Sequence, residues 1–445
     1  MEASRAAVDG GATDDEARFL AWLREHGADT SKLRWPVKDE DSGDRIAVAA
    51  VDVAQHEAVM SLPEKLLITP ACARADEVIG DIVVRHNMRG DVLLATFLLH
   101  EVRKGDASFW APYLRVLPAA PASVCNWSAE ETAQLCDAEL AERANGREMW
   151  VGELHDRYFT QMLTRDHPGV FPAADFSAEK FRFAWLIVQS RAFGRRLKET
   201  ALVPYADCLN HCSHVETSYH LVDGHFQLFS TQKGYAAGRE VVNSYGPNPN
   251  SKLLLDYGFA ILDNPRERIR FTMTLDCNDD LCPRKRDVLR RADAAMFQAI
   301  ELARGEFPTA ALVFVRVAGA DEAGLARLEA AADPRLPTAC TADEVKALRV
   351  LLERLRHVEK AAALDGDGGD LHARLGADLR ACADAGADEA QVEAAARALH
   401  AMSHRLTRKR IATSVRELVD TALQAVLVTS DALRDDTQRA GDERR

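Results

Sequence analysis

The chain has 445 residues with 56 basic and 69 acidic side chains, so its formal net charge is −13, and 47% of its residues are hydrophobic. This balance excludes a disordered, collagenous or fibrous chain, and at about 150 residues per domain the length predicts two or three domains. The acidic total argues against nucleic-acid binding, and the apolar runs are shorter than the roughly 18 residues of a membrane span.

The N-terminal part is predicted to be a small β-rich unit behind a flexible tail over residues 1–15. Apolar residues at helical spacing predict a helix over Glu16–His26, followed by a polar loop through Gly43. Pro63 and Pro70 interrupt the extended runs that follow, which predicts strands at Ile46–Val53, Val59–Leu62 and Lys65–Thr69. The tail resembles neither a secretory signal nor a transit peptide, so we expect an intracellular protein, cytoplasmic or nuclear, with a chloroplast location left open.

The middle of the chain is predicted to be helical between two β-rich stretches. Apolar spacing predicts a mostly helical insertion over about residues 71–189. The strand pattern returns after residue 202, where Tyr219–Val222 and His225–Phe229 flank Asp223-Gly224. This dipeptide is typical of a hairpin, because a primed turn requires positive φ.

The last third is predicted to be a separate helical domain over residues 266–435, followed by a charged tail over 436–445. Ala, Leu, Arg and Glu predominate there, and these residues favour helices. Thr341 and Glu344 have the spacing of a capping box, residues 365–370 predict a flexible joint, and further helices are predicted at Val392–His400 and Val415–Val428. The fold class is therefore α+β: a β-rich domain over 16–265 with a helical insertion, then an all-helical C-terminal domain.

Several common catalytic signatures are missing from the sequence. His100-Glu101 begins like a zinc-protease HExxH motif, but the fifth position is Lys104. The dipeptide Gly-Lys, required by a Walker A loop, does not occur, and neither does a GxSxG elbow. The nine cysteines lack the paired spacing of a zinc site, so no structural metal is expected.

Two segments concentrate polar residues beside apolar strands, and we call them the signature segments: Ala201–His211 and Glu240–Phe259. The first carries Asp207, Asn210 and His211, and the second carries Tyr245 in a turn. Polar groups next to buried strands must find partners, so each segment is either a satisfied core network or part of a ligand site. The residue chemistry alone leaves both interpretations open.

The signature segments resemble those of SET-domain methyltransferases of the Rubisco large-subunit lysine methyltransferase branch. Further stretches are similar to the same branch: Asp52–Pro63, Phe109–Pro118, Ser190–Leu197 and Gly238–Val242. The resemblance covers about residues 35–265, and the helical remainder is similar in length and composition to that branch's substrate-binding domain. It implies an S-adenosylmethionine-dependent protein-lysine N-methyltransferase, with no metal, acting as a monomer on a protein that carries the target lysine.

The resemblance also implies roles for individual residues. Tyr245 matches the catalytic tyrosine. The positions that match cofactor-binding residues are Gly43, Asp44, Arg45, Arg191, Asn210 and His211. The positions that match substrate-side residues are Arg195, Asp207, Tyr219 and Tyr257. At residues 43–46 the chain keeps only one glycine of the Gly-x-Gly-like turn that usually approaches the cofactor.

Structural interpretations compete with these roles. Tyr257 could be a core residue, Arg191 and Arg195 could form a solvated helix stripe at i,i+4 spacing, and Asp207 could bond only to backbone. Trp110 and Tyr113 are expected in the core.

Two other functions stay open at this point. One is protein-histidine methylation, as in the actin-specific relatives of the branch. The other is a catalytically silent SET protein that binds partners, which would be favoured if Asp44 or Arg45 filled the cleft.

Overall fold

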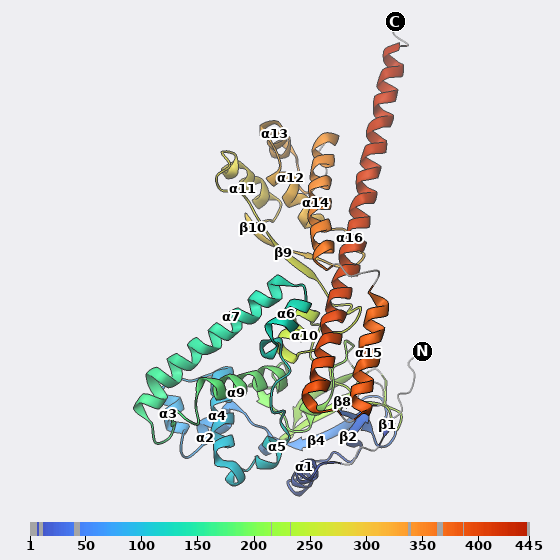
Figure 1. Cartoon of the computed structure of the whole chain (residues 1–445). Coiled ribbons are helices and arrows are strands. Elements are labelled where there is room, and N and C mark those ends of the chain that lie inside the picture. The colour runs from blue at the N-terminus through green and yellow to red at the C-terminus, as the bar shows by residue number, and fades with distance from the viewer. Residues whose placement is uncertain are drawn as a thin grey trace. The chain divides into compact units, whose positions relative to one another are not determined.

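The computed structural model describes residues 7–8, 12–39, 45–214, 216–231, 233–336, 340–362, 368–385 and 387–442. Contacts within the chain define two compact units (Figure 1). The first combines Met1–Ile261 with Asp370–Met402, and the second combines Leu262–Gly369 with Ser403–Arg445. The sequence predicts one boundary near residue 265. It does not predict that the chain returns to the first unit at Asp370–Met402. Among the described helices, none is both long and apolar enough to cross a membrane.

The strands of the first unit form small antiparallel sheets. One sheet has the order β1-β2-β3 (Ala7–Val8, Leu33–Asp39, Arg45–Ala49). A second has the order β4-β8-β7 (Ala58–Pro63, His225–Ser230, Thr217–Val222). The third is the pair β5 and β6 (Ala192–Phe193, Ala201–Leu202).

Strand β2 replaces part of the predicted polar loop. Pro36 lies within this strand: the register of β2 on β3 shifts between Arg34 and Val37, so the proline occupies an irregular position of the ladder. The side chains of β2 alternate in burial, as in a strand with one face in the core.

The predicted hairpin is confirmed, whereas a neighbouring predicted strand is wrong. Asp223 and Gly224 adopt φ of 48° and 73° between β7 and β8, as a primed turn requires. The predicted strand at Lys65–Thr69 is instead a 3-10 turn, η1 (Glu64–Leu66), followed by an isolated bridge between Ile68 and Leu202.

Helices occupy most of the chain between β4 and β5. Helix α1 (Asp14–Glu25) precedes them and begins two residues before the predicted start, at a capping box formed by Thr13 and Glu16. In the helical stretch, α4 packs along α9. Its elements are α2 (Pro70–Ala75), α3 (Gly80–Arg85), α4 (Gly90–Lys104), η2 (Gly105–Ala107), α5 (Ala111–Val116), η3 (Val124–Asn126), α6 (Ala129–Gln134), α7 (Ala138–His155), the π-helical η4 (Asp156–Leu163), α8 (Thr164–Asp166) and α9 (Ala178–Arg191).

The second unit is mostly helical but contains a strand pair, so the prediction of an all-helical C-terminal domain is wrong. Strands β9 (Ile269–Thr274) and β10 (Phe297–Leu302) pair antiparallel and bury Ile269, Met273 and Ile300 in the core of this unit. The many charged residues around these strands hide their alternation in the sequence. The helices are α11 (Cys282–Arg291), α12 (Thr309–Ala318), α13 (Glu322–Ala330), α14 (Thr341–Ala361) and the second part of α16.

The C-terminal helices differ from the prediction in three details. Thr341 is the first residue of α14 and Cys340 is the N-cap, so the predicted capping box is wrong. Residues 365–367 of the predicted joint lie outside the described residues, and α15 spans Gly369–Asp384. The two predicted helices are one continuous helix, α16 (Glu389–Asp442), because no proline interrupts this stretch.

Candidate active site

The two signature segments lie side by side in the first unit. The first continues from β6 through the 3-10 turn η5 (Ala206–Cys208), and the second continues into α10 (Asn250–Tyr257). His211 and Asn243 form a parallel bridge, in which the Asn243 amide donates to the Asn210 carbonyl at 2.8 Å. This backbone pairing brings the polar residues of both segments to one place.

A cavity of about 260 Å³ opens at the junction of these segments with the end of α9. Six of the residues singled out in the sequence line it: Arg191, Arg195, Asp207, Tyr219, Tyr245 and Tyr257. The cavity therefore gathers the predicted catalytic tyrosine and all four predicted substrate-side residues.

Arg191 and Asp207 form a buried ion pair at the cavity. Arg191 Nη1 donates to Asp207 Oδ2 at 3.2 Å and to the Asp207 carbonyl at 3.1 Å, and the Asp207 side chain has no exposed surface. Tyr113 Oη also donates to Asp207 Oδ2, at 2.7 Å. Burial raises the pKa of Asp207 and the guanidinium opposes this. Burial lowers the pKa of Arg191, but Asp207 and the other neighbouring groups together outweigh it, so the pKa of Arg191 is raised. Arg191 is thus held as a fixed cation.

Tyr245 is held at both its backbone and its hydroxyl. The Tyr245 amide donates to His211 Nδ1 at 3.0 Å, and Tyr245 Oη donates to the Leu209 carbonyl at 2.7 Å. Burial raises the pKa of Tyr245, so the phenol keeps its proton at neutral pH. Its one hydrogen is used by Leu209, so this oxygen can take part in a further hydrogen bond only as an acceptor.

Aromatic rings form the walls of the cavity. The rings of Tyr245 and Tyr257 lie 4.6 Å apart between centroids, and Tyr219 packs edge-on against Phe193 at 5.2 Å. Burial raises the pKa of Tyr257 to about 12 and also raises that of Tyr219, so these phenols are neutral as well. Tyr257 lines the cavity, so it is not simply a core residue.

Arg195 is exposed and lies against the backbone of the tyrosine turn. A Cβ atom built on Gly246, where φ is +118°, would lie 2.6 Å from Arg195 Nη2. A larger residue at position 246 would displace the guanidinium from this position. Arg191 and Arg195 therefore both face the cavity and are not merely a solvated helix stripe.

The other predicted cofactor residues do not line this cavity. Asn210 Nδ2 donates to Glu240 Oε1 at 3.0 Å, and the His211 ring lies behind Tyr245, 5.0 Å from it between centroids. Arg45 pairs with Glu16 at 2.9 Å and so does not fill the cavity. Gly43 and Asp44 lie outside the described residues.

Sequence reasoning missed several residues of the site. Tyr113 is buried as expected, but its bond to Asp207 also makes it part of the site. Phe193, Asn243, Asn248 and Lys252 line the cavity. Phe193 lies inside the Ser190–Leu197 stretch that carried the resemblance, so its position there was the available signal.

His211 predicts an acid-sensitive first unit. Burial lowers its pKa from about 6.5 to about 4, and Nδ1 must stay unprotonated to accept the Tyr245 amide. Between these pH values the unfolded chain binds a proton that the native ring excludes, so the free energy of unfolding falls as the pH decreases through this window. Urea unfolding at several pH values, followed by tryptophan fluorescence, measures this.

The matched variant for this pH dependence is His211→Asn, which removes the titrating ring. Its unfolding free energy should fall less steeply below pH 6.5, whatever its stability at neutral pH. Equal slopes for the two proteins would contradict the assignment.

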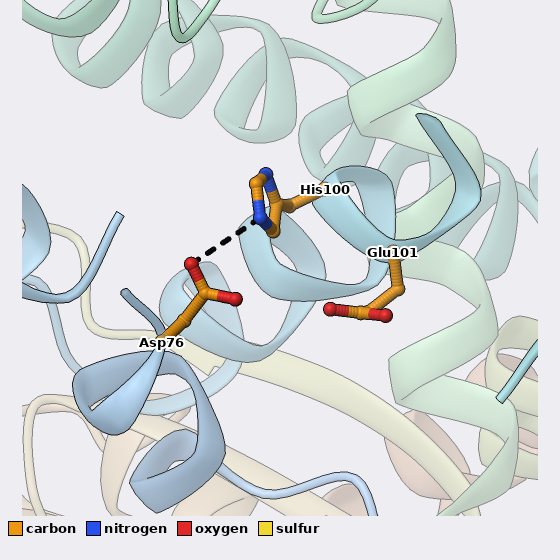
Figure 2. Close-up of side chains that lie close together, drawn as sticks. All are labelled: Asp76, His100 and Glu101. Atoms are coloured by element: carbon orange, nitrogen blue, oxygen red, sulfur yellow. Dashed lines mark ion pairs between the residues drawn. The ribbon is translucent and has the colours of Figure 1, made fainter. Parts of the chain in front are cut away.

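One further group of described residues has the arrangement of metal ligands: Asp76, His100 and Glu101 (Figure 2). Figure 2 shows the imidazole of His100 turned toward Asp76, and Nε2 lies 3.3 Å from Oδ1. Lys104 Nζ donates to Asp76 at 2.9 Å and to Glu101 at 2.6 Å. The lysine that breaks the zinc-protease motif thus supplies the positive charge that a cation would bring, and we assign the group to the core of the helical stretch.

A larger cavity, of about 390 Å³, lies in the second unit between α12 and α14. Phe314, Lys346 and Arg354 are among the residues that line it. None of the residues singled out as catalytic, cofactor-binding or substrate-binding lies there. The predicted catalytic and substrate-side residues therefore identify the smaller cavity, of about 260 Å³, as the candidate active site.

The antiparallel sheets, the helical stretch and the paired signature segments match solved structures of a SET-domain protein. The SET domain of LSMT bound to lysine and AdoHcy superposes with a TM-score of 0.70 at 21% identity, over 93% of this chain and 92% of that one. Rubisco LSMT bound to AdoMet gives 0.69 at 20% identity over 93% of both chains. The chain therefore has the SET-domain fold of Rubisco LSMT.

Sequence relatives agree with this fold, although no model of a protein family matches the chain. The chloroplastic Rubisco large-subunit N-methyltransferase of Nicotiana tabacum is 29% identical over 61% of this chain and 56% of its own length. The actin-histidine N-methyltransferase of Homo sapiens is 26% identical over 69% of this chain and 53% of its own. The chain thus spans about half the length of these curated relatives, and the predicted resemblance to Rubisco LSMT is confirmed.

Proposed function

We propose that this protein is an S-adenosylmethionine-dependent protein-lysine N-methyltransferase. The observation that carries the proposal is the convergence of Tyr245, Tyr257 and Arg191 on one cavity beside the paired signature segments. Solved neighbours of the same fold are bound to AdoMet or AdoHcy, and one also holds lysine. The tobacco and human relatives are named as methyltransferases acting on Rubisco and on actin.

The residues present fit the cofactor by their chemistry. We propose that Arg191, Asn210 and His211 would hold it, together with the segment around Gly43, Asp44 and Arg45. Arg191 is a fixed cation suited to a carboxylate group. When bound, S-adenosylmethionine would supply a methyl group on a sulfonium: a neutral amine would bond to the methyl carbon while the carbon–sulfur bond breaks, and the sulfur would leave as a neutral thioether.

The aromatic walls prepare a lysine for this reaction. Its amine has a pKa near 10.4 in water and is protonated at neutral pH. Desolvation between the rings of Tyr219, Tyr245 and Tyr257 disfavours the ammonium form and so lowers that pKa. The oxygen of Tyr245 can then accept a hydrogen bond from the amine and orient its lone pair, since its own proton is held by the Leu209 carbonyl.

The cavity favours lysine over the alternative, histidine. A lysine side chain is a narrow aliphatic chain that fits between rings, whereas an imidazole also needs a partner for its second ring nitrogen. Of the amide atoms that line the cavity, Asn243 Oδ1 already accepts from Thr217 Oγ1 at 3.4 Å, and Asn248 Nδ2 already donates to the Tyr245 carbonyl at 3.1 Å. We propose Arg195, Asp207, Tyr219 and Tyr257 as substrate-side residues.

We further propose that the SET catalytic domain spans residues 16–265 and that residues 266–435 bind the protein substrate. The cavity between α12 and α14 is a feature of the second part that a substrate protein could contact. The net charge of −13 suits a cationic partner.

The proposal is tested by incubating the protein with methyl-labelled S-adenosylmethionine and an extract of its source, followed by mass spectrometry of the labelled residues. Calorimetry measures cofactor binding separately. Label on lysine Nζ is expected. Label on histidine would replace the lysine assignment by the actin-histidine type, and cofactor binding without any label would favour the silent binding protein.

A further inference from the structure

The first part of α16 returns to the first unit and reaches the chain just after Tyr257. His400 Nδ1 accepts a hydrogen bond from the Ala260 amide at 3.3 Å, and its ring lies 6.4 Å from that of Phe259 between centroids. Ala401, the next residue of the helix, packs in one apolar cluster with Leu254 and Ala260. A residue 140 positions away in the sequence therefore contacts the end of the second signature segment.

This segment end, residues 257–261, is held from three sides. Gly258 adopts φ of +81° and packs directly on the Ala122 carbonyl. The buried Asn250 side chain bonds to both backbone groups of Ile261, at 2.8 and 3.0 Å. His400 is the third support, and the one that α16 provides.

Ring contacts connect Phe259 of this segment with Tyr245, the proposed catalytic tyrosine. Phe259 lies 6.1 Å from Tyr257 and 6.2 Å from Tyr245 between centroids, and those two tyrosines lie 4.6 Å apart. Closely packed rings cannot shift singly, so a displacement of Phe259 moves the tyrosine walls.

We propose that His400 is a positioning residue for methyl transfer: it fixes residues 259–260 and thereby the spacing of Tyr245 and Tyr257 around the substrate nitrogen. The inference rests on the proposed function. His400 does this as a neutral ring, because burial lowers its pKa to about 4 and Nδ1 is the acceptor. His400 is not among the residues that line the cavity, and it acts on the tyrosines through Phe259.

Two substitutions in the full chain separate the acceptor from the ring. In His400→Asn the amide oxygen can replace Nδ1 as the acceptor, whereas His400→Phe keeps a ring but has no acceptor. We expect His400→Phe to lower kcat about tenfold with KM for S-adenosylmethionine within about twofold, and His400→Asn to recover most of kcat. Equal kcat losses in both variants, matching equal losses of thermal stability, would show a structural role only and overturn the proposal.

Hydrogen exchange of the Ala260 amide tests the hydrogen bond to His400 without a measurement of methyl transfer. Its protection should fall in His400→Phe and return in His400→Asn, measured without cofactor or substrate. Unchanged protection in His400→Phe overturns the proposal. If the wild-type chain binds no cofactor and transfers no methyl group, the proposed function fails, and the exchange result still decides whether His400 fixes this segment.

Discussion

Replacement of Tyr245 by phenylalanine is expected to lower the rate of methyl transfer by about 10²- to 10³-fold, the usual effect of removing one polar group that acts on the reacting atoms. The hydroxyl is held by the Leu209 carbonyl, and Tyr245 lines the cavity, so we propose its oxygen as the group that orients the amine. The ring stays, and with it the packing on Tyr257 and His211. Cofactor affinity should therefore change by no more than about twofold.

The measurement compares single-turnover transfer from labelled S-adenosylmethionine with the cofactor Kd from calorimetry. Tyr158→Phe is the matched control, because it removes a phenol hydroxyl from η4 in the helical stretch, outside the cavity. The control should transfer methyl groups at the wild-type rate. A Tyr245→Phe protein with full activity would exclude Tyr245 as the catalytic residue and leave the cavity without its proposed chemistry.

Local signals account for the parts of the structure that the sequence predicts well. Asp223-Gly224 determines its hairpin because a primed turn needs two residues that tolerate positive φ. Each signature segment is recognisable by its own order of strand, turn and polar residue, and the backbone pairing of His211 with Asn243 brings the two segments together. The resemblance then assigned Asp207 and Tyr245 to one site, and the cavity contains both.

Long-range contacts account for what the sequence does not reveal. Tyr113 bonds to Asp207 across 94 positions, and His400 reaches Ala260 across 140, and no periodicity within either helix signals such partners. Strand β2 lies in a stretch that is predicted as a polar loop, and its pairing with β3 is itself a long-range contact that includes a register shift beside Pro36. Helix α16 is predicted as two helices, Val392–His400 and Val415–Val428, although nothing in the stretch between them ends a helix.

Substitution of Gly258 by alanine is expected to lower the free energy of unfolding of the first unit by about 3–5 kcal/mol, from left-handed strain and forced displacement of neighbours. A Cβ atom there would lie 1.8 Å from the Ala122 carbonyl oxygen and 2.2 Å from its carbon, and φ is +81°. Backbone cannot rotate away as a side chain can, so either the 257–261 segment or the chain at Ala122 must move. Tyr257 lies next to the change, so activity should fall together with stability.

Gly224→Ala is the control for this prediction, because Gly224 has a similar φ of +73° but nothing within 4 Å of a built Cβ atom. It carries the conformational strain without the overlap and should cost about 1 kcal/mol. Urea unfolding followed by tryptophan fluorescence compares the two variants, and all six tryptophans precede residue 262, so the signal reports the first unit. Equal losses in both variants would mean that φ alone sets the cost and that the chain at Ala122 gives way. A markedly larger loss at Gly258 would show that close backbone packing holds the wall of the proposed active site in place.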